Sequence, residues 1–329
     1  MKRYYRPMPQ SGPRPPRAET LAGGWLWFTH VEEITRGASR VIEASALPRA
    51  ALFRLTAPRA AKAGMTFDAP RLMGILNATP DSFSDGGRYE GLAGIARGRE
   101  LVEQGADILD IGGESTRPGA DFVDPQEENA RALPVIEGLA GIAPISIDTR
   151  KASVAAAALS AGADLINDVS GLTHDPEMAA LAAQMGAPIC IMHAKGDPKT
   201  MQNDPRYENV LLDVYDALDG QIALAEAAGI PRGNIIVDPG IGFGKKLEHN
   251  LALIRGLTLL HGLGCPILLG ASRKRFIGAL SGVEDASARV HGSIAVALAG
   301  VAQGAQMLRV HDVAQTRQAL ALWHASTSV

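Results

Sequence analysis

Eight short apolar runs that recur at even spacing after residue 70 constrain the fold of this 329-residue chain more than any other feature. The first run begins at Leu72 and the last at Gln306, so seven intervals cover 234 residues, about 33 residues each. The runs lack alternating polar residues and are bounded by Gly or Pro, which is typical of parallel strands buried on both faces. The segments between them, such as Lys151–Ala161 and Asp175–Met185, have helix-forming compositions. In chain order the runs are LMGILN from Leu72, DILDIGG from Asp107, PISID from Pro144, DLIND from Asp164, PICIMH from Pro188, NIIVDPG from Asn234, PILLGAS from Pro266 and QMLRVHD from Gln306.

This alternation predicts an α/β protein, and eight repeats favour a (β/α)8 TIM barrel with an N-terminal extension of about 70 residues. The 259 residues from 71 to 329 match the size of such a barrel, which is typically ~250 residues. An open, doubly wound sheet is the alternative, but the first run is not followed by the GxGxxG turn of its dinucleotide-binding form. We therefore expect an extension at residues 1–70 and a catalytic barrel at residues 71–329.

The extension has a composition of its own. Residues 1 to about 20 are rich in Pro and Arg and are expected to be irregular. Residues 24–56 hold short apolar pieces, GWLWF from Gly24 and RVIEA from Arg40, without sustained periodicity. These pieces are consistent with a small β appendage.

Composition argues against several classes of protein. The 32 basic and 35 acidic residues give a formal net charge of −3, which disfavours a general surface for nucleic acid or membranes. No apolar run reaches the ~18 residues of a membrane span, and the basic, Pro-rich N-terminus does not resemble a secretory signal. Cys190 and Cys265 lie in apolar runs, as buried thiols do in a reducing compartment. We expect a cytoplasmic protein.

Nearly every apolar run ends in a polar residue, and in a TIM barrel these strand ends meet at the catalytic face. Each residue taken alone has an ordinary structural explanation, such as a helix N-cap for an Asp or a solvated helix start for a Lys. The convergence of eight such ends on one rim favours a functional site. The residues that close the runs are Asn77, Glu114 to Arg117, Asp148, Asn167 with Asp168, His193, Asp238, Ser272 to Lys274, and Arg309 to Asp312.

These residues form two chemical sets. Carboxylate, amide and ammonium groups suit a flat, nitrogen-rich heterocycle, because a carboxylate accepts two N–H bonds from an aminopyrimidine edge while amide and ammonium groups donate to ring acceptors. Cations and a hydroxyl suit a phosphate or diphosphate. Together they favour transfer from a diphosphate-activated ring compound. The heterocycle set is Asp148, Asn167, Asp238 and Lys274, and the anion set is Thr116, Arg117, Arg309 and His311.

Two loops after the first and second runs, residues 79–88 and 115–124, are rich in Gly, Pro, Ser and Asp and have the composition of active-site lids. Phe83 is the apolar exception in the first loop, which is expected if it packs on a ligand when the loop closes. An ordinary surface loop is the alternative for both. The sequence contains no nucleophile elbow, Walker loop, zinc cluster or HExxH motif.

The motifs of these strand ends resemble those of the dihydropteroate synthase family, over about residues 68–326. They occur in family order on successive runs, which makes the joint signal specific. Departures are small: Ala78 stands where valine is commoner, and Ala194-Lys195 replace a more usual Met-Gln. The motifs are MGILNATPDSFSDGG, DIGGESTRPGA, ISIDTRK, INDVSG, IMHAKG, VDPGIGFGK, GASRKRFIG and RVHDV.

The resemblance implies an enzyme that condenses 6-hydroxymethyl-7,8-dihydropterin diphosphate with 4-aminobenzoate, with Mg²⁺ as cofactor, and that forms a homodimer. It also implies a role for each matching residue. The pterin would contact Asp148, Asn167, Asp238 and Lys274, which we take as the catalytic set, with Met192 and Phe243 lining the pocket. Asn77 would bind the metal; Thr116, Arg309 and His311 the diphosphate; and Phe83, Arg117, Pro118, Ser272 and Arg275 the aminobenzoate.

The expected reaction displaces pyrophosphate by an SN1-like path, since the electron-rich ring can stabilise positive charge at the exocyclic carbon. Two other functions remain open. A methyltetrahydrofolate:corrinoid methyltransferase would share the heterocycle set, but it has no use for a diphosphate site. A non-catalytic pterin-binding homologue should have lost some of Asn77, Asp148, Lys274 or His311, and all four are present.

Overall fold

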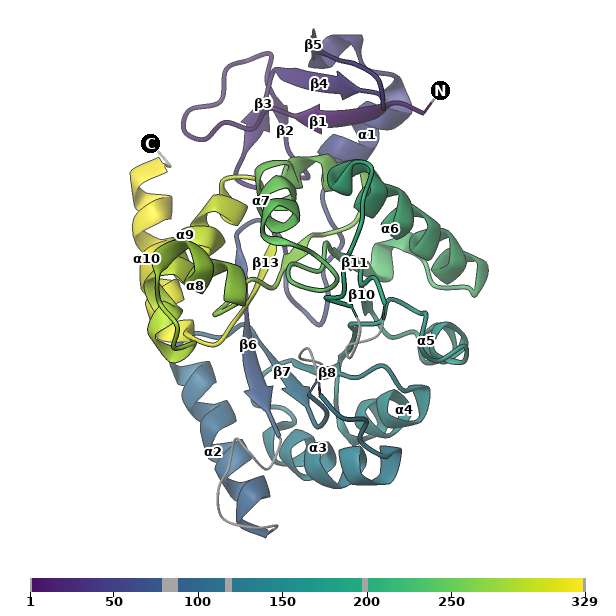
Figure 1. The fold of residues 1–329 in the computed structure, drawn as a ribbon, viewed down its shortest axis with the longest axis vertical. Coiled ribbons are helices and arrows are strands. Elements are labelled where there is room, and N and C mark those ends of the chain that lie inside the picture. The colour runs from purple at the N-terminus through teal and green to yellow at the C-terminus, as the bar shows by residue number, and fades with distance from the viewer. Residues whose placement is uncertain (1, 79–87, 116–119, 197–200, 328–329) are drawn as a thin grey trace.

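The computed structural model describes residues 2–78, 88–115, 120–196 and 201–327, and its centre is a sheet of eight parallel strands (Figure 1). The strand order is β11-β10-β9-β8-β7-β6-β13-β12, and a parallel bridge between Val237 and Ile267 links the two ends of this order. The sheet therefore closes into the predicted barrel. Its strands are β6 (Arg71–Asn77), β7 (Ile108–Gly112), β8 (Ile145–Asp148), β9 (Leu165–Asp168), β10 (Ile189–Met192), β11 (Ile235–Asp238), β12 (Leu268–Leu269) and β13 (Met307–Val310).

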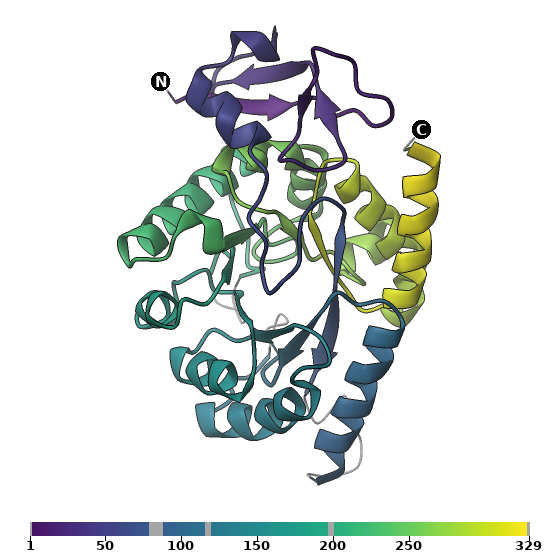
Figure 2. The same cartoon turned by 180° about the vertical axis from the view of Figure 1, so that it is seen from behind.

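Each of the eight apolar runs contains one of these strands. In β8, β9, β10 and β11 every residue is buried, because one face of the strand packs on helices and the other faces the barrel interior. The helices alternate with the strands and surround them (Figures 1 and 2). They are α2 (Arg88–Glu103), α3 (Pro125–Leu139), α4 (Ala152–Ala161), α5 (Met178–Met185), α6 (Val210–Ala227), α7 (Leu247–Arg255), α8 (Arg275–Ser281), α9 (Val290–Val301) and α10 (Val313–Thr327), with 3-10 turns η3 (Arg232–Asn234), η4 (Leu257–Leu263) and η5 (Ser287–Arg289).

Local signals set several helix ends. Asp124 caps α3 by accepting a hydrogen bond from the Gln126 backbone N–H at 2.9 Å, and Asn209 caps α6 in the same way through Leu212. Gly162 ends α4 in the left-handed region (φ +114°), where glycine carries no steric penalty. The two N-caps end the connections that follow β7 and β10, and Gly162 begins the turn into β9.

The N-terminal end of the barrel is filled by a compact apolar layer. Met65 and Phe67, which precede β6, are 8% and 3% exposed and pack there against side chains from seven strands. Residues just before β6 thus help to close this end of the barrel. Its strand members are Met73, Ile108, Leu165, Cys190, Ile236, Leu268 and Met307.

The extension folds as a small β unit with its own apolar cluster. An antiparallel sheet has the order β1-β4-β5, and β2 pairs with β3. Two of these strands, β1 and β2, lie within the first 20 residues, where the sequence predicts irregular structure. The elements are β1 (Tyr4–Pro7), β2 (Glu19–Thr20), β3 (Trp27–Phe28), β4 (His30–Ile34), β5 (Ser39–Glu43), η1 (Ala44–Ala46) and α1 (Arg49–Thr56), and the cluster contains Leu21, Leu26, Phe28, Val31, Ala44, Leu47 and Leu55.

The extension packs against the outer layer of the barrel, beside α6, as both views show (Figures 1 and 2). Lys2 lies 2.8 Å from Asp216, and Arg36 lies 2.8 Å from Asp213 and 2.9 Å from Asp216. The Tyr4 hydroxyl donates to Asp216 at 2.8 Å. These contacts join cations of the extension to an acidic face of α6.

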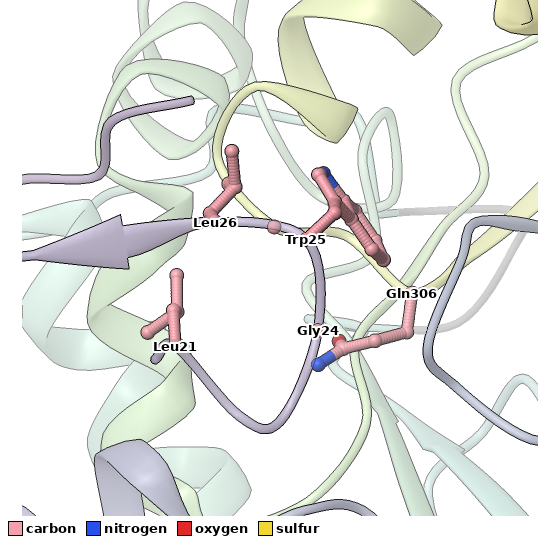
Figure 3. A pocket seen from close by; sticks show the side chains of 6 residues that line it. Leu21, Gly24, Trp25, Leu26 and Gln306 are labelled. Atoms are coloured by element: carbon pink, nitrogen blue, oxygen red, sulfur yellow. The ribbon is translucent and has the colours of Figure 1, made fainter. Parts of the chain in front are cut away.

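A small pocket lies at the seam between the extension and the barrel (Figure 3). Trp25 lines it and donates its indole N–H to the Val301 carbonyl at 3.2 Å. Gln306 lines it from the residue before β13, whereas Arg309 and His311 lie at the other end of that strand. The pocket is therefore on the side of the barrel away from the polar strand ends.

Candidate active site

Strands β7, β8, β9 and β13 bring four polar side chains into contact, from the middle of β7 and from the carboxyl halves of the other three. Arg309 Nε lies 2.5 Å from Asp110, and Arg309 Nη2 lies 2.5 Å from Asp148. The Asn167 amide lies 3.2 Å from Asp110. Asp110 is fully buried and Asp148 is 6% exposed, so these charges meet out of water. One guanidinium thus holds two carboxylates at the centre of the barrel mouth.

A second group forms around the loop after β11. Asp238 Oδ1 accepts from the Gly240 N–H at 2.7 Å, which fixes the orientation of the carboxylate. The Lys274 ammonium lies 4.4 Å from the Phe243 ring centroid and donates to the Ile241 carbonyl. Aromatic ring, ammonium and carboxylate together offer a stacking surface, a donor and an acceptor to a flat ligand.

Burial shifts the pKa values of these groups in opposite directions. It raises the pKa of Asp148 to about 7, although Arg309 opposes the shift, and it raises the pKa of Asp238 against the influence of Lys274. Burial lowers the pKa of Lys274 to about 8, with Asp238 opposing. Groups with perturbed pKa values that gather at one mouth are typical of functional sites.

The end of β12 and the end of β13 are linked by hydrogen bonds. The His311 backbone N–H donates to Ser272 Oγ at 3.2 Å, and His311 Nδ1 lies 3.0 Å from the same oxygen. The backbone of Arg273 is in the left-handed region (φ +59°), and its side chain forms an ion pair with Asp312, two residues after the end of β13. Arg275 begins α8 and is exposed. The structure therefore brings the predicted residues Ser272 and His311 together.

The remaining predicted residues divide into two groups. Asn77 ends β6 and is half-buried, and Met192 ends β10 and is 3% exposed, so both occupy strand ends as expected. Phe83, Thr116, Arg117 and Pro118 lie outside the described residues. Among the described residues, His, Cys, Asp and Glu side chains do not cluster in threes as a metal centre of that kind would need.

Sequence reasoning missed two charged residues at this site. Asp110 lies inside the apolar run DILDIGG, in the middle of a buried strand. Because charges are rarely buried without a partner, a carboxylate at this position could have indicated a cation facing it from another strand. Lys245 was obscured by Lys246, because adjacent lysines at a helix start resemble a solvated face. Only the structure separates them, as Lys245 is 3% exposed and Lys246 is exposed.

Comparisons with known proteins agree with this geometry. The family described as "Pterin binding enzyme" matches residues 73–311. The chain is 51% identical over 265 residues to the dihydropteroate synthase of Neisseria meningitidis serogroup B, covering 78% of this chain and 93% of that protein. It is 46% identical to the dihydropteroate synthase of Bacillus subtilis, covering 74% of this chain and 84% of the relative.

Solved structures give the same result. The dihydropteroate synthase of Xanthomonas albilineans with 4-aminobenzoic acid aligns with a TM-score of 0.78 at 46% identity, covering 83% of this chain and 99% of that one. The same enzyme in complex with 7,8-dihydropteroate aligns with a TM-score of 0.75 at 44% identity, covering 83% and 100%. By its matched residues, its identity to these relatives and its barrel, the chain belongs to the pterin binding enzyme family, among the dihydropteroate synthases.

Proposed function

We propose that this chain condenses 6-hydroxymethyl-7,8-dihydropterin diphosphate with 4-aminobenzoate, releasing pyrophosphate and forming 7,8-dihydropteroate, at the strand ends described above. The relatives named dihydropteroate synthase support this transferase activity. The assignment of residues rests on a polar set that the barrel gathers at one mouth. Its members are the buried Asp148, Asn167 and Asp238 and the half-buried Lys274.

In this proposal the pterin ring enters between Phe243 and the carboxylates. Asp238 keeps one oxygen on Gly240, so its other oxygen is available to the amino and ring N–H groups of the pterin. Lys274 and Asn167 donate to ring acceptors, and Met192 packs on the ring. Buried polar groups discriminate strongly, because a ligand that fails to pair them leaves them unsatisfied.

In this proposal the diphosphate lies toward β13, where Arg309 and His311 bind it. Thr116, which lies outside the described residues, is the third residue assigned to it. Arg309 is shared with Asp110 and Asp148, so its position is fixed before the substrate arrives. A preorganised cation stabilises the charge that develops on the leaving pyrophosphate without reorganising during the reaction. This assignment distinguishes the proposal from a pterin methyltransferase, which needs no diphosphate site.

We propose Mg²⁺ as cofactor, with Asn77 as its protein ligand. The donor set fits: an amide oxygen is a hard ligand, and Mg²⁺ in phosphate sites uses few protein groups, substrate oxygens and water supplying the rest. The lack of a three-carboxylate cluster among the described residues accords with that mode. When bound, the ion would neutralise charge on the diphosphate.

The C–O bond to diphosphate breaks first and leaves positive charge that the exocyclic CH₂ shares with the ring. The amine of 4-aminobenzoate then attacks that carbon, and the proton it loses goes to solvent or pyrophosphate. An aniline nitrogen is neutral at pH 7, so attack requires no strong general base. His193 is a poor candidate for one, since burial and Lys245 lower its pKa to about 3. Asp148 stabilises positive charge on the ring, and Ser272 and Arg275, with Phe83, Arg117 and Pro118, hold the aminobenzoate.

We also propose that the enzyme is a homodimer in the cytoplasm. The dimer is an expectation from the family resemblance, which gel filtration with light scattering tests. Cys190 and Cys265 are buried free thiols, a state that a reducing compartment maintains. No described helix has the length and apolar character needed to cross a membrane.

The decisive experiment mixes the purified protein with the pterin diphosphate, 4-aminobenzoate and Mg²⁺, and follows both dihydropteroate and pyrophosphate. Equal amounts of the two products are expected. Binding of the pterin without turnover would support a non-catalytic homologue, and methyl transfer from methyltetrahydrofolate without pyrophosphate release would support the corrinoid methyltransferase.

A further inference from the structure

A buried lysine next to the proposed pterin pocket has no part in the mechanism above. Lys245 is 3% exposed, and no carboxylate among the described residues lies within ion-pair distance of its ammonium. Its Nζ lies 2.9 Å from His193 Nδ1, 3.2 Å from the His193 carbonyl and 2.9 Å from the Phe243 carbonyl. Burial lowers the pKa of Lys245, and Asp238 opposes that shift. A buried ammonium is costly unless its three donors are all used, and the three oxygen and nitrogen atoms around Nζ offer one acceptor for each.

These three bonds join two walls of the pocket. His193 follows directly after Met192 at the end of β10, and Phe243 lies in the loop after β11. The two segments approach closely, since a Cβ on Gly240 would lie 1.9 Å from the His193 carbonyl oxygen, and Gly240 has a φ of +66°. Only glycine fits there, which shows that the loop is pressed against the end of β10.

The other carbonyls of this loop are held from different directions. Lys274 donates to Ile241, Gln202 donates to Gly242 at 2.5 Å, and the Tyr207 hydroxyl donates to Gly244 at 2.8 Å. Of these side chains, only Lys245 binds the loop and the end of β10 at once. A protonated Lys245 can only donate, which would make Nδ1 of His193 the acceptor and place the ring proton on Nε2.

We propose that Lys245 is a positioning residue which, through His193, holds the Phe243 loop against the end of β10 and so sets the width of the pterin pocket. Its charge also acts on the carboxylate opposite. Burial raises the pKa of Asp238, and Lys245, after Lys274, opposes that shift. This inference rests on the proposed function, because the width of the pocket matters only if the pterin binds there.

The test compares Lys245→Met with Lys246→Met. Lys246 is the neighbouring lysine, but it is exposed and pairs with Asp204 at 2.8 Å, so it provides the matched control. We expect Lys245→Met to raise the KM and Kd for the pterin diphosphate about 10- to 100-fold, the range for losing buried bonds to a charged group, while the KM for 4-aminobenzoate changes less than about twofold. Lys246→Met should change neither value by more than about twofold.

A second pair of variants applies even if Lys245→Met does not fold. His193→Gln keeps a side-chain acceptor for the ammonium and should retain pterin affinity within a few-fold, whereas His193→Leu removes the acceptor and should lose about tenfold. Where Lys245→Met folds, it can be combined with His193→Leu. The double variant should bind the pterin diphosphate no more weakly than the weaker-binding single variant, because both changes remove the same contact between Lys245 and His193.

Several results would overturn the inference: unchanged pterin affinity in folded Lys245→Met, an equal loss for both substrates, or equal behaviour of the two His193 variants. Failure of the proposed function is distinguishable from these, because it is measured on the unaltered protein, which would then release no pyrophosphate or bind no pterin diphosphate. Near-ultraviolet circular dichroism of each variant establishes that it is folded before binding is compared.

Discussion

Replacing Asp238 by Asn exchanges a single carboxylate oxygen at the proposed pterin site for an NH₂ group. The Asp238 side chain is 5% exposed, and Oδ1 accepts from the Gly240 N–H at 2.7 Å. Asparagine keeps that bond through its carbonyl oxygen, so the loop after β11 should keep its shape. The other oxygen becomes an NH₂ group, which cannot accept from the pterin. The substitution therefore converts one acceptor into a donor that faces a donor.

The magnitude follows from what is lost. A hydrogen bond to a charged group contributes about 1.5–3 kcal/mol, and leaving a buried donor unpaired costs about 1–3 kcal/mol. These contributions overlap, because they describe the same broken contact, so we expect about 2–4 kcal/mol in total. At 1.36 kcal/mol per factor of ten, pterin affinity should fall roughly 30- to 1000-fold.

Isothermal titration with the pterin diphosphate measures this directly, and Asp204→Asn serves as the control. Asp204 carries a carboxylate that is 53% exposed and paired with Lys246, so its loss should leave affinity within about twofold. Unchanged pterin affinity in folded Asp238→Asn would remove Asp238 from the site and refute the orientation assigned to it. Thermal unfolding of both variants shows whether the loop survives the change.

Three further predictions follow from the same structure. Pterin affinity should decrease when the pH drops under about 7, because buried Asp148 gains a proton, and should decrease again when the pH rises above about 8, because Lys274 loses one. Calorimetric titrations across this pH range measure both changes, and Lys274→Arg should abolish the decrease at alkaline pH. Asp110→Asn should lower kcat about 10- to 100-fold by loosening Arg309, with the KM for 4-aminobenzoate unchanged; steady-state kinetics tests this. A chain beginning at Met65 keeps the apolar layer of Met65 and Phe67, so it should fold and turn over, with an unfolding midpoint lower by roughly 5–10 °C; an unchanged midpoint in calorimetry would contradict the docking contacts.

The barrel was predictable because its strands carry a simple signal. A strand buried on both faces cannot alternate polar and apolar residues, and eight such runs at even spacing leave few folds open. Once the strands are placed, the polar residue that closes each run marks its carboxyl end, and in a TIM barrel these ends share one face. Asp148, Asn167 and Asp238 could therefore be assigned to the same rim. The extension had no comparable signal. Strand β1 pairs with β4 in the register Tyr4 to Ile34, and such a long-range pairing leaves little trace in local composition.

The supporting charges escaped prediction for a different reason. Position along a strand tells which end a side chain occupies, but it does not tell which other strand it reaches. Arg309 on β13 reaches Asp110 on β7 and Asp148 on β8 across β6, because inward side chains of a closed barrel meet at its centre. That meeting depends on closure, which no single segment encodes.

The same distinction separates residues that contact the substrate from residues that hold them. A pterin-binding carboxylate such as Asp238 must keep an acceptor free for the ligand, so it lies at a strand end and is visible in the sequence as a polar interruption. A supporting residue such as Lys245 has its bonding capacity filled by the protein, since a buried charge is stable only when each donor is paired. Its partners are backbone carbonyls and the ring of His193, 52 residues away in the sequence, and the chain around it resembles an ordinary helix start. Sequence patterns thus predict the groups that face the substrate better than those that support them.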